Sequence, residues 1–117
     1  MKKEKFEKLF KKADSQIRSD YQDLLERSIK ETPELDIKEG QRNLTIVLEE
    51  LAELSKCVTK AMRGKVNKTN LIEEMADVAI GMNYVSVIFG ITNEDVTKAI
   101  NVKLDQLESD LNEKSAK

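Results

Sequence analysis

Residues 44–62 read LTIVLEELAELSKCVTKAM, and this stretch decides the fold. Its apolar side chains recur every three or four residues, which places them along one stripe of an α-helix. The stripe consists of Leu44, Val47, Leu48, Leu51, Leu54, Ser55, Val58 and Met62. Arg63-Gly64 follows, and a glycine just after a periodic run is typical of a helix end. The sequence therefore predicts an amphipathic helix over 42–62 with one face packed against other helices.

Helical periodicity extends over most of the chain, which has one proline and four glycines in 117 residues. We predict further helices over 3–30, over 70–89 and from about residue 92 onward. The first of these helices is expected to end at Thr32-Pro33. Residues 34–40 show no clear period and are interpreted as a connector with room for a short helical turn.

Two capping signals mark helix starts. Asn70 with Glu73, and Thr92 with Asp95, each have the spacing of a capping box. Together with the short links, these signals predict an all-α fold, a four-helix bundle in a single domain over residues 1–117. The helix over 3–30 either joins its own bundle or packs across an oligomer, and the sequence leaves both arrangements open.

Composition excludes several classes of function. The 20 Lys and Arg residues nearly balance the 22 Asp and Glu residues, which argues against a nucleic acid partner bound over the whole surface. There is no histidine, so Ser-His or Cys-His catalysis, His-ligated zinc and the Glu-x-x-His di-iron motif are excluded. The single cysteine, Cys57, excludes an internal disulfide and is interpreted as a small buried hydrophobe in a reducing cytosol.

No targeting or membrane segment is expected. The N-terminal residues are basic but lack a following run of seven or more apolar residues, so they do not resemble a signal peptide. The longest apolar-rich stretch, 78–91, contains Asn83 and two glycines and is too short for a membrane span. We therefore expect a cytoplasmic protein with no membrane partner.

Two pairs of carboxylates carry the candidate chemistry. Glu50 and Glu53 are three residues apart, and so are Glu74 and Asp77. Residues at this spacing lie roughly 60° and ~4.5 Å apart on a helix, so each pair can aim both carboxylates at one point. Each pair borders aliphatic residues, where a carboxylate is costly unless it is paired or binds a metal. If the two helices pack antiparallel, the four carboxylates form an oxygen-only site that suits Mg²⁺, with Mn²⁺ as a substitute.

A solvated helix face is the alternative interpretation of these acids, because Glu-x-x-Glu is common on exposed helices and forms ordinary pairs with lysine. Two pairs with the same offset from aliphatic residues favour the metal site. Glu49 and Glu73 point further toward solvent; we assign Glu73 to capping and Glu49 to a supporting role.

The two motifs resemble a known family. Glu49-Glu50-Leu51-Ala52-Glu53-Leu54, followed by Ile72-Glu73-Glu74-Met75-Ala76-Asp77-Val78, resembles the E-x-x-E and E-x-x-D signature of the MazG-like all-alpha nucleoside triphosphate pyrophosphohydrolases, a superfamily related to dimeric dUTPases. The resemblance covers about residues 41–107. It implies a bundle of that type and Mg²⁺-dependent hydrolysis of a nucleoside triphosphate to the monophosphate and pyrophosphate. By position, Glu50, Glu53, Glu74 and Asp77 would be the metal ligands.

Nearby cations are candidates for binding the substrate phosphates. Lys56, Lys60 and Arg63 follow Glu53 toward the end of its helix, where they could neutralise polyphosphate oxygens or simply decorate a solvated face. Lys103 resembles a lysine that members of the family carry near the C-terminal end. Relatives commonly follow it with Asn or Arg, whereas this chain has Gln106 and Ser109.

Several alternatives remain open. Either Glu50 or Glu53 is the catalytic group that takes a proton from the attacking water. Low-specificity candidates for a base pocket are Asn43, Asn83 and Tyr84, of which Tyr84 also fits ordinary packing. The competing function is a non-catalytic helical interaction module with its oligomer interface at 75–89. Both functions fit a homodimer or homotetramer, because helix 70–89 is apolar on more than one face.

Overall fold

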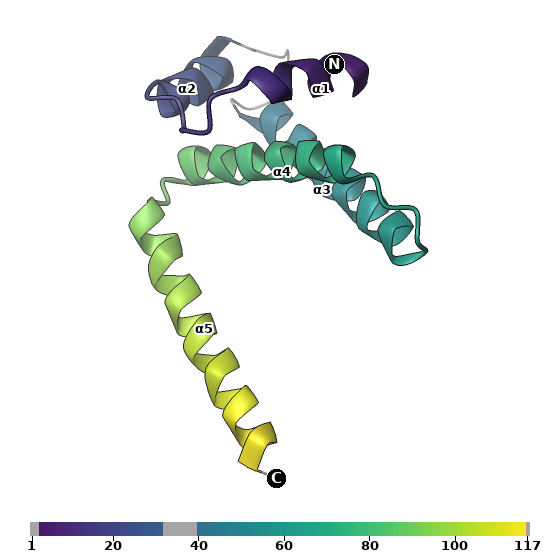
Figure 1. Cartoon of the computed structure of the whole chain (residues 1–117). Helices are drawn as coiled ribbons and strands as arrows, with labels where there is room; N and C mark the ends of the chain where they lie inside the picture. The colour runs from purple at the N-terminus through teal and green to yellow at the C-terminus, as the bar shows by residue number, and fades with distance from the viewer. Residues whose placement is uncertain (1–2, 32–39, 117) are drawn as a thin grey trace. The chain divides into compact units, whose positions relative to one another are not determined.

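The computed structural model describes residues 3–31 and 40–116. This part of the chain contains five α-helices and no strands, which confirms the predicted all-α class (Figure 1). The helices are α1 (Lys3–Lys12), α2 (Tyr21–Glu31), α3 (Gln41–Met62), α4 (Lys68–Phe89) and α5 (Asn93–Ala116). The predicted helix end at Thr32-Pro33 and most of the predicted connector over 34–40 lie outside the described residues.

The chain divides into two compact units, Met1–Val85 and Ser86–Lys117. Helices α1, α2 and α3 and most of α4 belong to the first unit, and α5 belongs to the second. The single domain predicted over 1–117 stays a prediction.

The single helix predicted over 3–30 is wrong, because α1 ends at Lys12 and α2 begins at Tyr21. The break contains short polar side chains that bond locally and compete with the helical backbone. Asp14 Oδ1 accepts a hydrogen bond from the Gln16 backbone N–H at 3.0 Å. The guanidinium of Arg18 donates to both carboxylate oxygens of Asp20, at 3.0 and 2.8 Å. Asp20 immediately precedes α2, and its carbonyl accepts the first helical hydrogen bond, from the Leu24 N–H at 3.0 Å.

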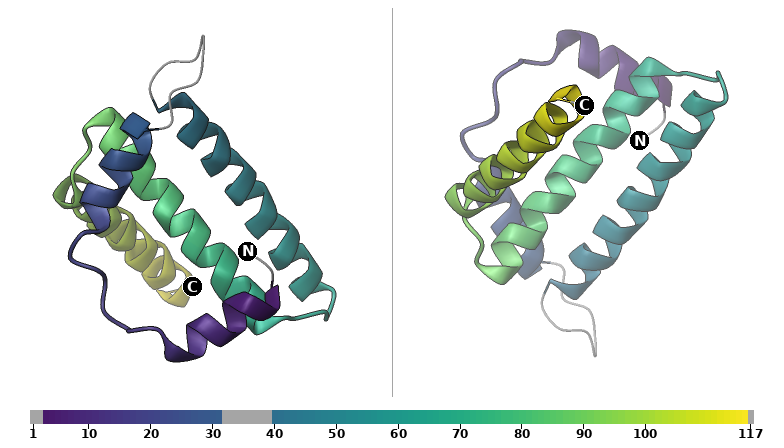
Figure 2. Two further views of the ribbon diagram at one scale, coloured as in Figure 1. Left: turned by 90° about the horizontal axis from the view of Figure 1, so that it is seen from above. Right: turned by 90° about the horizontal axis from the view of Figure 1, so that it is seen from below.

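Helices α3 and α4 run antiparallel and side by side (Figure 2). Three pairs of residues define their register: Cys57 with Asn70, Glu50 with Asp77, and Val47 with Gly81. Gly81 is buried and allows a close approach, because a Cβ at this position would lie 3.2 Å from a methyl carbon of Val47. The antiparallel packing expected from the two carboxylate motifs is therefore present.

Helix α2 packs on this pair through a small apolar core and several polar contacts. Leu25 and Ile29 are buried, as is Val47 on α3. Ser28 accepts hydrogen bonds from Tyr84 Oη at 2.9 Å and, more weakly, from Asn43 Nδ2 at 3.4 Å. These contacts connect α2 to both α3 and α4.

Two helix ends match the sequence signals. At the end of α3, Gly64 has a φ of 88°. Its N–H donates to the Ala61 carbonyl, and the Lys65 N–H donates to the Lys60 carbonyl. These two hydrogen bonds form the Schellman motif of a helix C-terminus. In the second unit, Thr92 Oγ1 accepts the Asp95 N–H and Asp95 Oδ2 accepts the Thr92 N–H, both at 3.1 Å. This capping box lowers the pKa of Asp95, because the carboxylate accepts hydrogen bonds from Thr92.

The capping box predicted at Asn70 and Glu73 is wrong. Helix α4 begins at Lys68, and Asn67 Oδ1 accepts the Asn70 N–H at 3.1 Å. Asn67 is thus the capping residue, three positions earlier than expected. The Asn70 side chain instead donates to Cys57 Sγ at 3.0 Å, and Cys57 is partly buried.

Among the described helices, no single one is long and apolar enough to cross a membrane. Helices α4 and α5, taken together as one bent pair, meet the same criteria of length and composition.

Candidate metal centre

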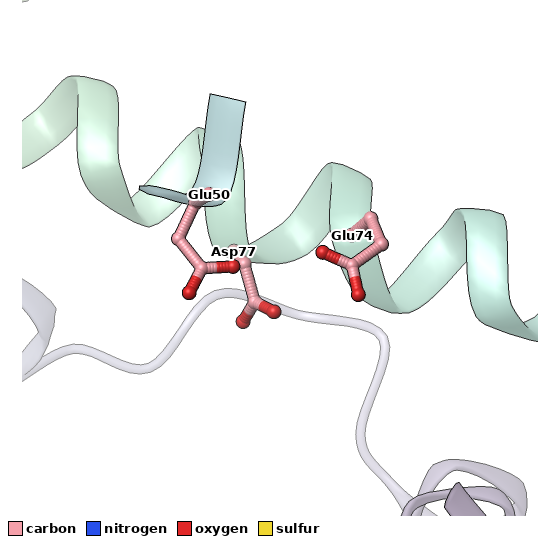
Figure 3. Close-up of side chains that lie close together, drawn as sticks. All are labelled: Glu50, Glu74 and Asp77. Atoms are coloured by element: carbon pink, nitrogen blue, oxygen red, sulfur yellow. The ribbon is translucent and has the colours of Figure 1, made fainter. Parts of the chain in front are cut away.

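Three carboxylates meet where α3 and α4 pack together. Glu50 comes from α3, and Glu74 and Asp77 come from α4 (Figure 3). One oxygen of each lies within 4.8 Å of the others, and all three side chains are partly buried. Of the four ligands predicted from the two motifs, the structure thus brings three together.

Contacts on both sides hold these carboxylates in register. The close approach of Val47 to Gly81 lies about one helical turn to one side, since Val47 precedes Glu50 by three residues and Gly81 follows Asp77 by four. The hydrogen bond from Asn70 to Cys57 lies on the other side, one turn before Glu74. Because both contacts join α3 to α4, neither helix can slide along the other without breaking them.

The surroundings of Glu50 favour its protonated form. Burial, followed by the negative charge of Asp77, raises the pKa of Glu50 from its ordinary value of 4.5 to about 6. A hydrogen bond shared with Asp77 favours the protonated form further, and the charges of Glu74 and Glu53 act in the same direction. This carboxyl group therefore takes up a proton more readily than an isolated glutamate does.

Glu74 experiences the same crowding. Burial raises its pKa first, and the charges of Asp77, Glu53 and Glu73 raise it further. Its Oε2 atom is buried and has no hydrogen-bond partner among the described residues. A buried carboxylate oxygen without a donor carries a desolvation cost that a bound cation would relieve.

The donor set fits a hard divalent cation. It consists of carboxylate oxygens only, which Mg²⁺ and Mn²⁺ prefer to softer ligands. Oxygens on one octahedral Mg²⁺ lie roughly 3 Å apart in adjacent positions and about 4 Å apart in opposite ones. A spread of up to 4.8 Å therefore requires only small side-chain movements.

Glu53, the fourth predicted ligand, does not join the three carboxylates. Its side chain is 53% exposed, and its Oε1 lies 3.8 Å from Lys56 Nζ. It is nevertheless close enough for its charge to raise the pKa of both Glu50 and Glu74. The structure thus separates an inner trio from one exposed carboxylate at its edge.

The predicted phosphate-binding cations have different positions. Lys56 is next to the cluster through its ion pair with Glu53. Lys60 and Arg63 are exposed in the last turn and at the C-cap of α3. Lys103 is on α5, in the second unit. Phosphate binding by these residues stays a prediction.

The three candidates for a base pocket make contacts with α2. Asn83 Nδ2 donates to Tyr21 Oη at 2.8 Å, and Tyr84 Oη donates to Ser28 Oγ. Asn43 is buried, and its Oδ1 has no hydrogen-bond partner among the described residues. They thus lie along the α2 side of the α3–α4 pair, and their role in base binding stays a prediction.

Sequence reasoning missed four residues that support this region: Tyr21, Ser28, Cys57 and Asn70. A serine or tyrosine within an amphipathic stripe gives no signal of its partner on another helix. The spacing of Asn70 and Glu73 is a signal, but it fits a helix cap as well as a contact with another helix. Only the register of α3 against α4 identifies Cys57 as the acceptor for Asn70.

No family model matches this chain, and neither does any curated protein or any solved structure. The family resemblance therefore depends on the two carboxylate motifs.

Proposed function

We propose that this protein is a Mg²⁺-dependent pyrophosphohydrolase that hydrolyses a nucleoside or deoxynucleoside triphosphate to the monophosphate and pyrophosphate. The observation that carries the proposal is the convergence of Glu50, Glu74 and Asp77 from two antiparallel helices. The unpartnered, buried Oε2 of Glu74 supports it, because solvated surface acids have water as a partner. The motif resemblance supplies the reaction.

In this proposal the inner trio binds the cation. When bound, Mg²⁺ would screen the phosphate oxygens, orient the scissile bridge and acidify a water. The positive charge would also reverse the pKa shift of Glu50, because a nearby cation favours the ionised carboxylate. Glu50, Glu74 and Asp77 would then all be ionised ligands.

Glu53 is the better placed of the two candidate bases. It is exposed, it lies outside the trio, and its carboxylate would stay free when the other three bind the cation. A base must reach the attacking water without being consumed as a ligand. We therefore propose that Glu53 takes the proton and that Glu50 acts as a ligand.

Two lysines would offset part of the negative charge at the site. Three ionised carboxylates exceed the charge of one divalent cation, so the site would still repel a triphosphate. Lys56 is adjacent to Glu53, and Lys60 follows one turn later on α3. Their ammonium groups would offset the remaining negative charge as the substrate approaches.

A nucleotide panel with wild-type protein and Mg²⁺ or Mn²⁺ tests the reaction. We expect pyrophosphate and a nucleoside monophosphate in equal amounts, with neither orthophosphate nor a diphosphate. Chelation of the cation should abolish turnover, and adding the cation back should restore it. If no common ribo- or deoxyribonucleoside triphosphate releases pyrophosphate, the proposed function is wrong.

Three variants distinguish the proposed ligand from the proposed base. Glu74→Gln should lower kcat/KM by about a hundredfold or more, because it removes a ligand from the inner trio. Glu53→Gln should lower kcat by about a hundredfold or more but leave binding of the cation intact. Glu49→Gln is the matched control, since Glu49 is an exposed glutamate on the same helix, and it should retain full activity.

A further inference from the structure

Helices α3 and α4 have three buried residues, and all of them lie on the same side of the inner trio: Asn43, Val47 and Gly81. On the other side, residues 53–62 of α3 and 68–74 of α4 are exposed or half-buried. The hydrogen bond from Asn70 Nδ2 to Cys57 Sγ, at 3.0 Å, is on this side. Because the unit Met1–Val85 buries none of its own side chains there, this hydrogen bond contributes a larger share of what holds the two helices together.

Glu74 is the member of the inner trio that depends most on this side. Glu50 and Asp77 share a hydrogen bond, whereas Glu74 Oε2 has no partner among the described residues. Burial raises the pKa of Glu74 most, and the charges of Asp77, Glu53 and Glu73 raise it further, because each of them repels the ionised form. Without a cation, an ionised Glu74 is therefore repelled by the groups around it.

Asn70 is placed to oppose this repulsion. It precedes Glu74 by four residues, so the two side chains lie on one face of α4, about one turn apart. Cys57 follows Glu53 by four residues on α3, and Glu53 is opposite Glu74 in the antiparallel register. The contact therefore joins the two helices one turn from Glu74. It carries no charge, so the repulsion among the carboxylates does not act on it directly.

We propose that Asn70 is a positioning residue for the cation site: through its hydrogen bond to Cys57, it keeps Glu74 within reach of the other two members of the inner trio. This inference rests on the cation binding in the proposed function, but not on the reaction. Residues that orient metal ligands typically change metal affinity by about 10–100-fold when they are replaced. Asn70 thus contributes to affinity for the cation as well as to stability.

Binding of Mn²⁺ alone tests the proposal, with the free ion measured by electron paramagnetic resonance. Asn70→Ala should raise the dissociation constant about tenfold or more, because Glu74 is then free to move away from the trio. Ser28→Ala is the matched control: it also removes a side chain that hydrogen-bonds between helices, but on α2, beyond the buried side of the trio. It should lower the Tm by a comparable amount and bind Mn²⁺ like the wild type.

Variants of Cys57 separate positioning from stability. Cys57→Ala removes the acceptor and should weaken Mn²⁺ binding as Asn70→Ala does, whereas Cys57→Ser keeps an acceptor and should recover most of the affinity. In the Asn70→Ala background, Cys57→Ala should cause little further loss, because the two residues act through one contact. A purely structural contact would instead lower the Tm in these variants and leave the dissociation constant unchanged.

Alkylation of Cys57 by iodoacetamide gives a second readout, which needs no substitution. The chain has one cysteine, so the rate reports this thiol alone. Coupling between two sites is reciprocal, so bound Mn²⁺ should hold the contact closed and slow the reaction in the wild type. The ion should have little effect on the rate in Asn70→Ala.

The outcomes distinguish this inference from the proposed function. Equal Mn²⁺ binding by the wild type, Asn70→Ala and Cys57→Ala overturns the positioning role and leaves the cation site in place. A wild-type protein that binds no Mn²⁺ overturns both. Mn²⁺ binding that depends on Asn70, in a protein that releases no pyrophosphate, supports the positioning role and counts against the reaction alone.

Discussion

Gly81 on α4 lies directly against Val47 on α3, so close that a Cβ at residue 81 would be 3.2 and 3.3 Å from the two methyl carbons of Val47. Val47 is buried and β-branched, so its methyl groups have little freedom to move aside. Asp77 is one turn from Gly81, and Glu50 is one turn from Val47. This close contact between the helices therefore helps determine how near the carboxylates come to one another.

Gly81→Ala should consequently separate α3 from α4. Overpacking costs roughly 1–3 kcal/mol, and the gain in helix propensity, about 1 kcal/mol, offsets part of it. We expect a net loss of about 1 kcal/mol in the free energy of unfolding by urea, together with weaker cation binding. Val47→Ala should relieve the contact, so the double variant should be more stable than the sum of the two single losses. Strict additivity would show that the two residues do not press on each other.

The metal-free protein should become less stable as the pH rises from about 4.5 to about 7. The pKa of Glu50 is raised to about 6 in the folded state, so the folded protein binds more protons than the unfolded chain across this interval. The stability contributed by this proton is complete below pH 4.5 and is lost as the pH rises through 6. The rise of the Glu50 pKa from 4.5 to about 6 corresponds to at most about 2 kcal/mol.

Thermal unfolding in the presence of a chelator checks this dependence. Glu50→Gln cannot ionise, so the variant should lose most of the decline between pH 4.5 and 7 and be more stable than the wild type at pH 7. Glu49→Gln, on the same helix but exposed, should follow the wild-type curve. An equal decline in all three proteins would assign the pH dependence to other groups.

The sequence predicted some of the features that depend on one helix alone, but not all of them. The bounds of α3 followed from its apolar stripe and Gly64, and the start of α5 followed from Thr92 and Asp95. The break between α1 and α2 was missed because Ala13 and Ile17 continue the apolar spacing through it. In the structure, Asp14 accepts a hydrogen bond from the Gln16 N–H and Asp20 accepts one from Arg18, and these local hydrogen bonds replace the helix despite that spacing.

Features that depend on two helices could be predicted only in part. The motifs predicted that Glu50, Glu74 and Asp77 could meet, but they could not separate Glu53 from them. Glu50 lies about 60° around α3 from Val47, the residue that contacts Gly81 on α4, whereas Glu53 lies about 120° away on the same side. An apolar period does not reveal which of two adjacent faces a neighbour will cover.

Divalent cations should stabilise the protein through the inner trio. Mg²⁺ or Mn²⁺ at about a hundred times its dissociation constant adds about 2.7 kcal/mol to the free energy of unfolding. We expect a corresponding rise in Tm for the wild type and for Glu53→Gln, and little rise for Glu74→Gln or Asp77→Asn. The result would count against the inner trio if Glu53→Gln lost the effect and Asp77→Asn kept it.

Cation binding should also release protons near pH 6, because it favours the ionised form of Glu50. Titration calorimetry in two buffers with different ionisation enthalpies measures this release. It should be larger at pH 6 than at pH 8, where Glu50 is already ionised without the cation. Glu50→Gln should release fewer protons at pH 6. Equal release at both pH values would contradict the assignment.

Tyr84→Phe separates a structural role from a role in base binding. The Tyr84 hydroxyl donates to Ser28 Oγ at 2.9 Å and connects α4 to α2. Loss of this hydrogen bond should cost about 1 kcal/mol in unfolding free energy. If the contact is only structural, turnover should keep the same ranking of nucleotides as in the wild type. A changed ranking among bases, at unchanged affinity for the cation, would instead assign Tyr84 to the base pocket.

Asn67→Ala is the matched control for Tyr84→Phe. Loss of the α4 cap should also cost about 1 kcal/mol, but Asn67 lies near the opposite end of the helix from Tyr84.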